Sequence, residues 1–127
     1  EGDYIKDALT EVNWFMRDWR RDRSRAIDTR TVDIIAATQQ LLNTSTPFLM
    51  LSGYRTPETN ALLRKRSRSV AKNSLHMKGQ AVDLRMQGKS VRQVATAAAS
   101  CAAGGVGRYS RSNFVHLDCG EKRLWGR

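Results

Sequence analysis

Two short stretches, AVDLRM at residues 81–86 and FVHLDC at residues 114–119, place apolar side chains at every second position. Such alternation is typical of a β-strand with one face against a core, because successive side chains of a strand point to opposite faces. His or Asp occupies open positions in both stretches. If the two strands belong to one sheet, its non-core face collects Asp83, His116 and Asp118.

Helical patterns come before these strands. Apolar residues at spacings of three and four over residues 3–21 predict a first helix, whose apolar and aromatic stripe we expect to lie in the core. This stripe consists of Tyr4, Ala8, Val12, Phe15, Met16 and Trp19. A second helix is expected after a cap at Asp28 or Thr29, ending near Asn43. Its expected inward register is Val32, Ile35, Ala36, Gln39 and Leu42.

The rest of the chain alternates short strands with helices. The apolar run at residues 48–51 predicts a buried strand, and Thr56 followed by a proline predicts the start of a short helix. Residues 64–79, which include the basic run RKRSRS, are expected to form a mobile loop, and Ser90 with Gln93 forms a capping box for a further helix. This order favours an α+β fold with a small antiparallel sheet and helices packed on one face.

The chain length of 127 residues suits a single domain, residues 1–127, with N-terminal helices in 1–45 and an α+β core in 46–127. No apolar run is long enough to span a bilayer. The chain begins without an initiator Met, a basic segment or an apolar segment, so we expect any export signal to have been removed before residue 1. We expect a monomer.

The net charge of +10 predicts attraction to polyanions, which include nucleic acid, anionic lipid and carboxylate-rich polymers such as a bacterial cell wall. No zinc-finger, homeodomain or RNP-like motif accompanies the charge, so a nucleic-acid partner is not expected. Two cysteines, Cys101 and Cys119, leave two readings open: one disulfide in an oxidising compartment, or two small buried thiols.

The two histidines of the chain both lie close to aspartates of the predicted strands. His76 comes seven residues before Asp83, and His116 lies on a strand whose open face also carries Asp118. Two imidazoles and a carboxylate that converge on one cleft suit a zinc ion with a fourth place left for water, which is the arrangement of catalytic zinc. Spacing alone leaves open that each histidine is an ordinary solvated side chain.

Three segments resemble one known family. SLHMKGQAVD, residues 74–83, matches the pattern SxHxxGxAxD of the zinc D-alanyl-D-alanine metallopeptidases, whose fold is shared with hedgehog signalling domains. SGYRTPETN, residues 52–60, is similar to the segment in that family that carries a substrate-binding arginine, and GGVGRYSRSNFVHLDCG, residues 104–120, resembles its final metal-binding strand. The similarity covers roughly residues 48–125 and suggests the branch of murein endopeptidase K and YcbK-like proteins.

The resemblance implies roles for four residues. His76, Asp83 and His116 would be the ligands of one zinc ion, and Arg55 would bind a carboxylate or carbonyl oxygen of the substrate. The chemistry of the residues agrees, because the planar fork of donors in arginine suits a carboxylate. Without the resemblance, a solvated or salt-bridged arginine is the equally good interpretation of Arg55.

The chain departs from the family pattern at the expected general base. Many relatives carry Glu or Asp three residues before the final histidine ligand, but Asn113 occupies that place here, and an amide is no useful proton acceptor. Asp118 is the expected substitute and Glu121 the second choice. The alternative role for Asp118 is to hold a metal ligand or Arg55 by hydrogen bonds.

The resemblance therefore predicts a zinc peptidase that hydrolyses an amide bond in peptidoglycan stem peptides or cross-links, as an endopeptidase or a carboxypeptidase. It also implies a periplasmic or wall-facing location. The alternative is a catalytically inactive, zinc-bearing domain that binds the cell wall, and the missing acid at residue 113 favours it.

Overall fold

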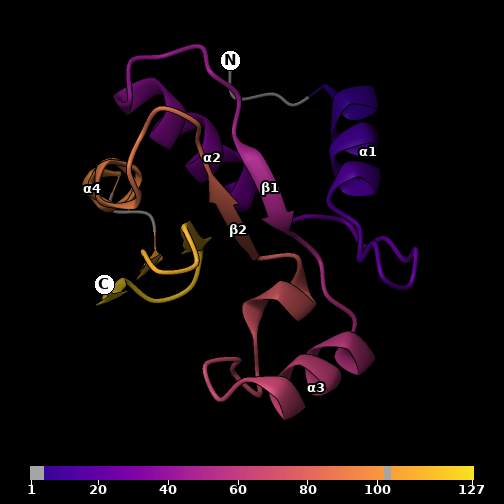
Figure 1. Cartoon of the computed structure of the whole chain (residues 1–127). Helices are drawn as coiled ribbons and strands as arrows, with labels where there is room; N and C mark the ends of the chain where they lie inside the picture. Colours follow the sequence, from indigo (N-terminus) through magenta and orange to yellow (C-terminus); the bar gives the residue numbers. More distant parts are fainter. Residues whose placement is uncertain (1–4, 102–103) are drawn as a thin grey trace.

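Four α-helices, one 3₁₀-helix and five strands form the part of the chain that the structure, a computed structural model, describes: residues 5–101 and 104–127. Figure 1 shows their arrangement. The elements are α1 (Lys6–Phe15), α2 (Thr29–Leu41), β1 (Leu49–Ser52), α3 (Pro57–Arg66), η1 (Leu75–Lys78), β2 (Ala81–Arg85), α4 (Val91–Ser100), β3 (Gly105–Tyr109), β4 (Phe114–Asp118) and β5 (Arg123–Gly126). The predicted α+β class is confirmed.

The sheet has the strand order β1-β2-β4-β3-β5. The pairs β1–β2, β2–β4 and β3–β4 are antiparallel, as expected, whereas β3 and β5 run parallel and make the sheet mixed. β5 was not predicted, because its four residues are too few to show alternation. β1 was predicted as a buried strand, but Leu49 at its start is 52% exposed. This burial was predicted wrongly because β1 is an edge strand.

One face of the sheet carries the core, and α2 and α4 cover it. Val82 and Leu84 of β2 are fully buried there, as the alternation predicted, and Val115 and Leu117 of β4 lie beside them. α4 adds a buried face of small apolar residues and begins with the predicted capping box. The helices therefore pack on one face of the sheet and leave the other face of β2 and β4 for polar side chains.

The inward face of α2 differs from the predicted register. Thr31, Ile34 and Thr38 are its buried residues, whereas Ala36, expected inside, is exposed. Thr31 and Thr38 tolerate burial because each hydroxyl group donates to a backbone carbonyl: Thr31 to Gly79 at 3.3 Å and Thr38 to Ile34 at 2.7 Å. Of the predicted inward residues, Leu42 is buried and Val32 and Ile35 pack partly against the core. The centre of the buried face was missed because buried threonines look polar in a sequence.

The predicted aromatic stripe of the first helix is not core. α1 ends at Phe15, earlier than expected, and Phe15 is 67% exposed while Trp19 beyond it is 64% exposed. Tyr4 lies outside the described residues. Only Met16 is buried, with Val12 packed partly against the core. α1 stands apart from α2 and α4 in Figure 1, in agreement with the exposure of its aromatic residues.

Asp18 joins this N-terminal segment to the start of α3. Its carboxylate is 1% exposed and accepts hydrogen bonds from the backbone N–H and the hydroxyl group of Thr56, both at 2.9 Å. Thr56 is the predicted cap of α3, and its oxygen accepts from the N–H of Thr59 at 3.1 Å. The segment just before α3 is thereby fixed.

The basic run after residue 63 is only partly a loop. Residues 64–66 form the last turn of α3, where positive charge suits the helix dipole, and Leu75–Lys78 forms η1. The predicted loop is therefore confined to the residues between these two helices.

The two cysteines are free thiols that lie beside different turns of α2. The Cys119 sulfur lies 3.6 Å from the Thr31 hydroxyl, and the Cys101 sulfur lies 3.9 Å from that of Thr38. Seven helical residues separate these contacts by roughly 10 Å, which is too far for a disulfide without movement of the backbone. The structure thus favours the reading as two thiols.

Candidate metal centre

One row of paired residues crosses all five strands. Ser52 of β1 pairs with Asp83 of β2, Asp83 with His116 of β4, His116 with Gly107 of β3, and Gly107 with Trp125 of β5. Paired residues project to the same face of a sheet and have neighbouring side chains. The row lies on the face away from α2 and α4, so strand pairing alone places Asp83 beside His116, as the sequence predicted.

His76 reaches the same place from η1. The hydroxyl group of Ser74 accepts from the backbone N–H of His76 at 3.2 Å, and His76 is 2% exposed. The ring nitrogen Nδ1 lies 2.8 Å from the carbonyl oxygen of Gly53. Because a carbonyl oxygen can only accept, Nδ1 carries a hydrogen, which leaves Nε2 as the nitrogen that can bind a metal ion. Nε2 lies 3.2 Å from Oδ1 of Asp83.

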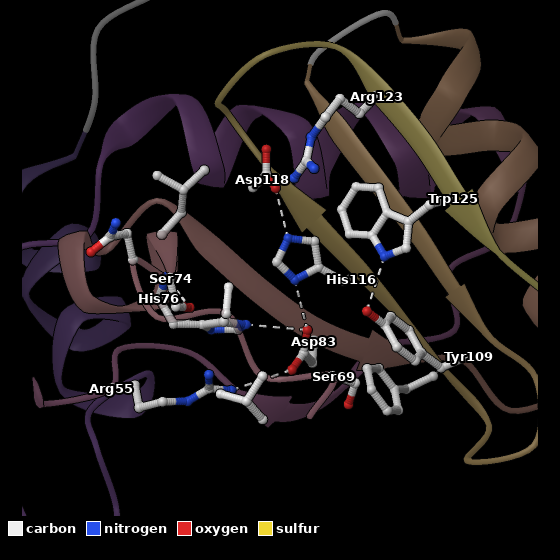
Figure 2. A pocket seen from close by; sticks show the side chains of 15 residues that line it. Arg55, Ser69, Ser74, His76, Asp83, Tyr109, His116, Asp118, Arg123 and Trp125 are labelled. Atoms are coloured by element: carbon white, nitrogen blue, oxygen red, sulfur yellow. Dashed lines mark hydrogen bonds and ion pairs between the residues drawn. The ribbon is translucent and has the colours of Figure 1, made fainter. Parts of the chain in front are cut away.

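His116, like His76, has a hydrogen-bonding contact at each of its two ring nitrogens. Its Nδ1 lies 3.1 Å from Oδ1 of Asp83, and its Nε2 lies 2.7 Å from Oδ2 of Asp118. Oδ1 of Asp118 accepts from the backbone N–H groups of Gly105 and Gly120, each at 2.9 Å. Asp118 is 3% exposed. Figure 2 shows the contact between Asp118 and the His116 ring. Both oxygens of Asp118 are thus engaged, one with this ring and one with the backbone.

These contacts shift three pKa values. Burial by itself lowers the pKa of His116, but the hydrogen bonds to Asp118 and Asp83 outweigh it and raise this pKa to about 9. For Asp83, burial raises the pKa, but His76 and His116 lower it well below its ordinary value. Burial likewise raises the pKa of Asp118, and the bonds from His116 and two backbone N–H groups bring it below the usual value. The cluster therefore holds two carboxylates in their charged form.

The donor set of this cluster suits a metal ion. One ligand atom each from His76, Asp83 and His116 lies within 4.8 Å of the others. If both imidazoles are neutral and donate to Gly53 and Asp118, their free electron pairs face a carboxylate oxygen, which is stable only with a cation between them. Two imidazole nitrogens and one carboxylate oxygen make a ligand set for zinc and similar divalent ions.

Arg55 supports Asp83 from the opposite side. Its guanidinium lies 3.7 Å from Oδ2 of Asp83 and donates to Oδ1 of Asn60 at 3.0 Å and to the hydroxyl oxygen of Ser52 at 3.4 Å. Burial lowers the pKa of Arg55, although Asp83 opposes this shift. Arg55 is 7% exposed. Its two NH₂ groups are therefore engaged by the protein, whereas its Nε is buried and has no hydrogen-bond partner among the described residues.

The five predicted site residues line one cleft of about 280 Å³. Ser69, the last residue of the basic run, and the following Val70 and Ala71 also line this cleft. Asn113 and Glu121 do not line it. Asn113 lies in the turn between β3 and β4 with a φ of 58°, a left-handed conformation that Asn adopts more readily than most residues.

The structure adds an aromatic wall that the sequence analysis missed. Trp125 lies across β3 because residue 107 is glycine: a Cβ atom there would lie 2.5 Å from the indole. The indole is centred 5.3 Å from the His116 ring, and its N–H donates to the hydroxyl oxygen of Tyr109 at 3.0 Å. Arg123 also lines the cleft. The pairing of Gly107 with Trp125 could have indicated this wall. It could not be read from the sequence, because it depends on the register of β5, which was not predicted.

The chain was compared with known proteins. Residues 1–125 match the family described as peptidoglycan L,D-endopeptidase MepK. The protein of that name from Escherichia coli strain K12 is 47% identical over 122 residues, which are 96% of this chain and 67% of that protein. A probable peptidoglycan L,D-endopeptidase MepK from Haemophilus influenzae is 38% identical over 118 residues, 92% of this chain and 63% of that one.

Among solved structures, the chain is similar to the Serratia marcescens L-Ala D-Glu endopeptidase ChiX. The TM-score is 0.49 at 19% identity, with 75% of this chain and 68% of that chain covered. In the described ranges, 5–101 and 104–127, no helix has the length and apolar character needed to cross a membrane.

Proposed function

The chain belongs to the family of peptidoglycan L,D-endopeptidase MepK, and from this premise we propose that it hydrolyses an amide bond in peptidoglycan stem peptides or cross-links with one zinc ion held by His76, Asp83 and His116. Membership of this family makes the chain a peptidoglycan peptidase of a metal-dependent class. The identity of the metal, the ligands and the cleaved bond are the parts that we propose.

The observation that carries the proposal is the convergence of Nε2 of His76, Nδ1 of His116 and the carboxylate of Asp83 at the floor of one cleft. Zinc suits these nitrogen and oxygen donors. When bound at such a site, zinc provides an activated water and polarises the carbonyl of the scissile amide. In this proposal, all other contributions to catalysis come from side chains of the protein, which orient the ligands and the substrate.

Asp118 has two candidate roles: it could accept a proton during catalysis, or it could position His116. The geometry supports the positioning role. From the sequence it was expected to be the proton acceptor. Its Oδ2 faces Nε2 of His116, on the side of the ring away from Asp83, and its Oδ1 is engaged by Gly105 and Gly120. We therefore propose that Asp118 positions His116, because it fixes the hydrogen on Nε2 and leaves Nδ1 free to act as a ligand.

Arg55 is proposed to act on both Asp83 and the substrate. Its ion pair with Oδ2 of Asp83 leaves Oδ1 directed at the two histidines, which orients the carboxylate. Arg55 also lines the cleft, so a substrate carbonyl or carboxylate oxygen that enters can share its N–H groups. A change at Arg55 should consequently weaken both metal binding and substrate binding.

We propose that the protein acts as a monomer in the periplasm or at the cell wall. The net charge of +10 favours this setting, because peptidoglycan and many wall polymers are anionic and attract basic proteins over distances of about a Debye length.

The direct test is incubation of the metal-loaded protein with purified peptidoglycan sacculi, followed by chromatography of released peptides. New fragments are expected with the wild-type protein, none after treatment with a chelator, and recovery after zinc is added. His76→Ala should release no fragments. Glu11→Gln, a change on the exposed surface of α1 and outside the cleft, should retain activity and serves as the control.

A second candidate function is a zinc-bearing domain that binds the wall without hydrolysis. Asn113 and the full engagement of Asp118 favour it, because neither supplies a free proton acceptor in the cleft. This function predicts that the protein sediments with sacculi but releases no peptide under any metal condition. Fragment release that depends on zinc excludes it.

A further inference from the structure

A second arginine, Arg123, lines the cleft, and no step of the proposed mechanism uses it. Arg123 is the first residue of β5 and is exposed. Figure 2 places it with Trp125 on one side of the pair formed by His116 and Asp83, whereas Arg55 lies on the other side. The cleft therefore has cationic side chains on two sides of the candidate metal centre.

Arg123 packs on the ring of Trp125, and other residues fix the position of that ring. Its Cζ atom lies 4.6 Å from the centre of the Trp125 ring, which is the distance of a cation–π contact. The indole itself is fixed by its hydrogen bond to Tyr109, and the Tyr109 ring stacks on Phe114 with centroids 4.6 Å apart and an interplanar angle of 8°. Gly107 provides the space beneath the indole. This support reduces the conformational entropy that Arg123 loses when it binds a ligand.

The two arginines differ in what they can offer a ligand. The side chain of Arg55 is only 9% exposed, and its two NH₂ groups are engaged by Asp83, Asn60 and Ser52. Its Nε has no partner among the described residues, but it is buried. By contrast, no ion pair joins Arg123 to a carboxylate within residues 5–101 and 104–127. Asp118, labelled beside it in Figure 2, already accepts from His116 and from two backbone N–H groups. The guanidinium group of Arg123 is therefore better suited than that of Arg55 to bind an anionic group of a ligand.

We propose that Arg123, supported by Trp125, forms a subsite for a carboxylate group of the substrate peptide. The indole of Trp125 lies close to both groups: its centroid is 5.3 Å from that of the His116 ring, and its ring centre is 4.6 Å from Cζ of Arg123. An extended peptide advances roughly 3.3 Å per residue, so the bound carboxylate belongs one or two residues from the scissile amide. The inference rests on the proposed function for the identity of the peptide, because peptidoglycan stem peptides carry carboxylates that suit a bidentate arginine.

The test compares binding of two forms of one ligand by calorimetry. The first form is a soluble stem peptide released from purified sacculi, and the second is the same peptide with its carboxylates converted to amides. Arg123→Gln should weaken binding of the carboxylate form by roughly 10- to 100-fold, which corresponds to the loss of charge-assisted hydrogen bonds. Binding of the amidated form should change less than about twofold, and Arg123→Lys should recover part of the loss because it restores the charge without the fork.

Arg111→Gln is the matched control, because Arg111 is exposed in the turn between β3 and β4 and does not line the cleft. It removes the same charge and should leave both peptides bound as in the wild type. Equal losses for the two peptides, no loss at Arg123, or the same loss at Arg111 would each overturn the subsite. Sacculus digestion is scored separately: if the wild type releases no fragments but shows the carboxylate preference, the subsite stands and the proposed function falls.

Discussion

The Asp118→Asn substitution separates the two roles of Asp118 most sharply. Asp118 now accepts three hydrogen bonds, from His116, Gly105 and Gly120. Asparagine has one accepting oxygen and one donating NH₂ group. If its oxygen kept the two backbone N–H groups, its NH₂ group would face Nε2 of His116, which would have to give up its hydrogen and accept instead.

The opposite rotamer of the asparagine would place NH₂ against two backbone N–H groups and leave them buried without partners, at about 1–3 kcal/mol each. The first arrangement is therefore favoured, and it moves the hydrogen of neutral His116 to Nδ1, the nitrogen that faces Asp83. A protonated Nδ1 cannot be a ligand. Loss of such a supporting contact typically weakens metal binding by 10- to 100-fold.

The assay is zinc titration of the purified variant in competition with a chromophoric chelator. It is accompanied by ¹⁵N NMR of the metal-free imidazole above about pH 10, where the ring is neutral, to identify the protonated nitrogen. Weaker zinc binding, together with a hydrogen on Nδ1, is expected. Asp7→Asn, on the exposed first turn of α1, is the control and should bind zinc as the wild type does. If Asp118→Asn bound zinc within about twofold of the wild type yet released no peptide from sacculi, the positioning role would be refuted and Asp118 would be the proton acceptor.

Three further outcomes are expected. His76→Ala should lower bound zinc from one ion per chain to none, measured by atomic emission after dialysis. Gly107→Ala would place a Cβ atom 2.5 Å from the indole of Trp125, so it should shift the near-UV circular dichroism and destabilise the fold by about 1–3 kcal/mol in urea; an unchanged spectrum would refute the packing argument. Burial raises the pKa of Asp18, but hydrogen bonds from Thr56 and the backbone outweigh it and lower the pKa, so Asp18 stabilises the fold above its unfolded value of about 3.9 and less as pH falls through its folded value. Asp18→Asn should hence lower the free energy of unfolding by about 1–3 kcal/mol at pH 7, and the difference from the wild type should shrink below about pH 4.

The two strands that carry Asp83 and His116 of the candidate metal centre could be predicted, because the alternation of apolar residues is a local pattern. In β2 and β4, alternation identified the buried residues Val82, Leu84, Val115 and Leu117, and the same alternation assigned Asp83 to the other face. Capping residues were equally reliable, since a cap bonds within three residues of itself. Alternation thus gave the type and buried face of β2 and β4 correctly, and the caps gave the starts of α2, α3 and α4 correctly.

The predicted buried faces of helices were wrong where burial depends on which other element packs against the helix. The stripe of α1 has helical spacing, yet Phe15 and Trp19 are exposed because no other element covers them. In α2 the buried Thr31 and Thr38 find carbonyl partners that no composition rule reveals. Periodicity shows which side of a helix is apolar; it does not show what covers that side.

The sequence by itself determined which groups are available for the proposed chemistry: Asp83 and His116 lie on strands whose apolar faces fix their orientation, and His76 lies just before the first of these strands. Only the tertiary structure decided how these groups are supported. The partners of His116 and His76 come from Asp118 and the Gly53 carbonyl, and Trp125 reaches the cleft through the register of a four-residue strand. Such contacts join segments distant along the chain, and their geometry is set by strand pairing and packing rather than by any local preference of the residues involved.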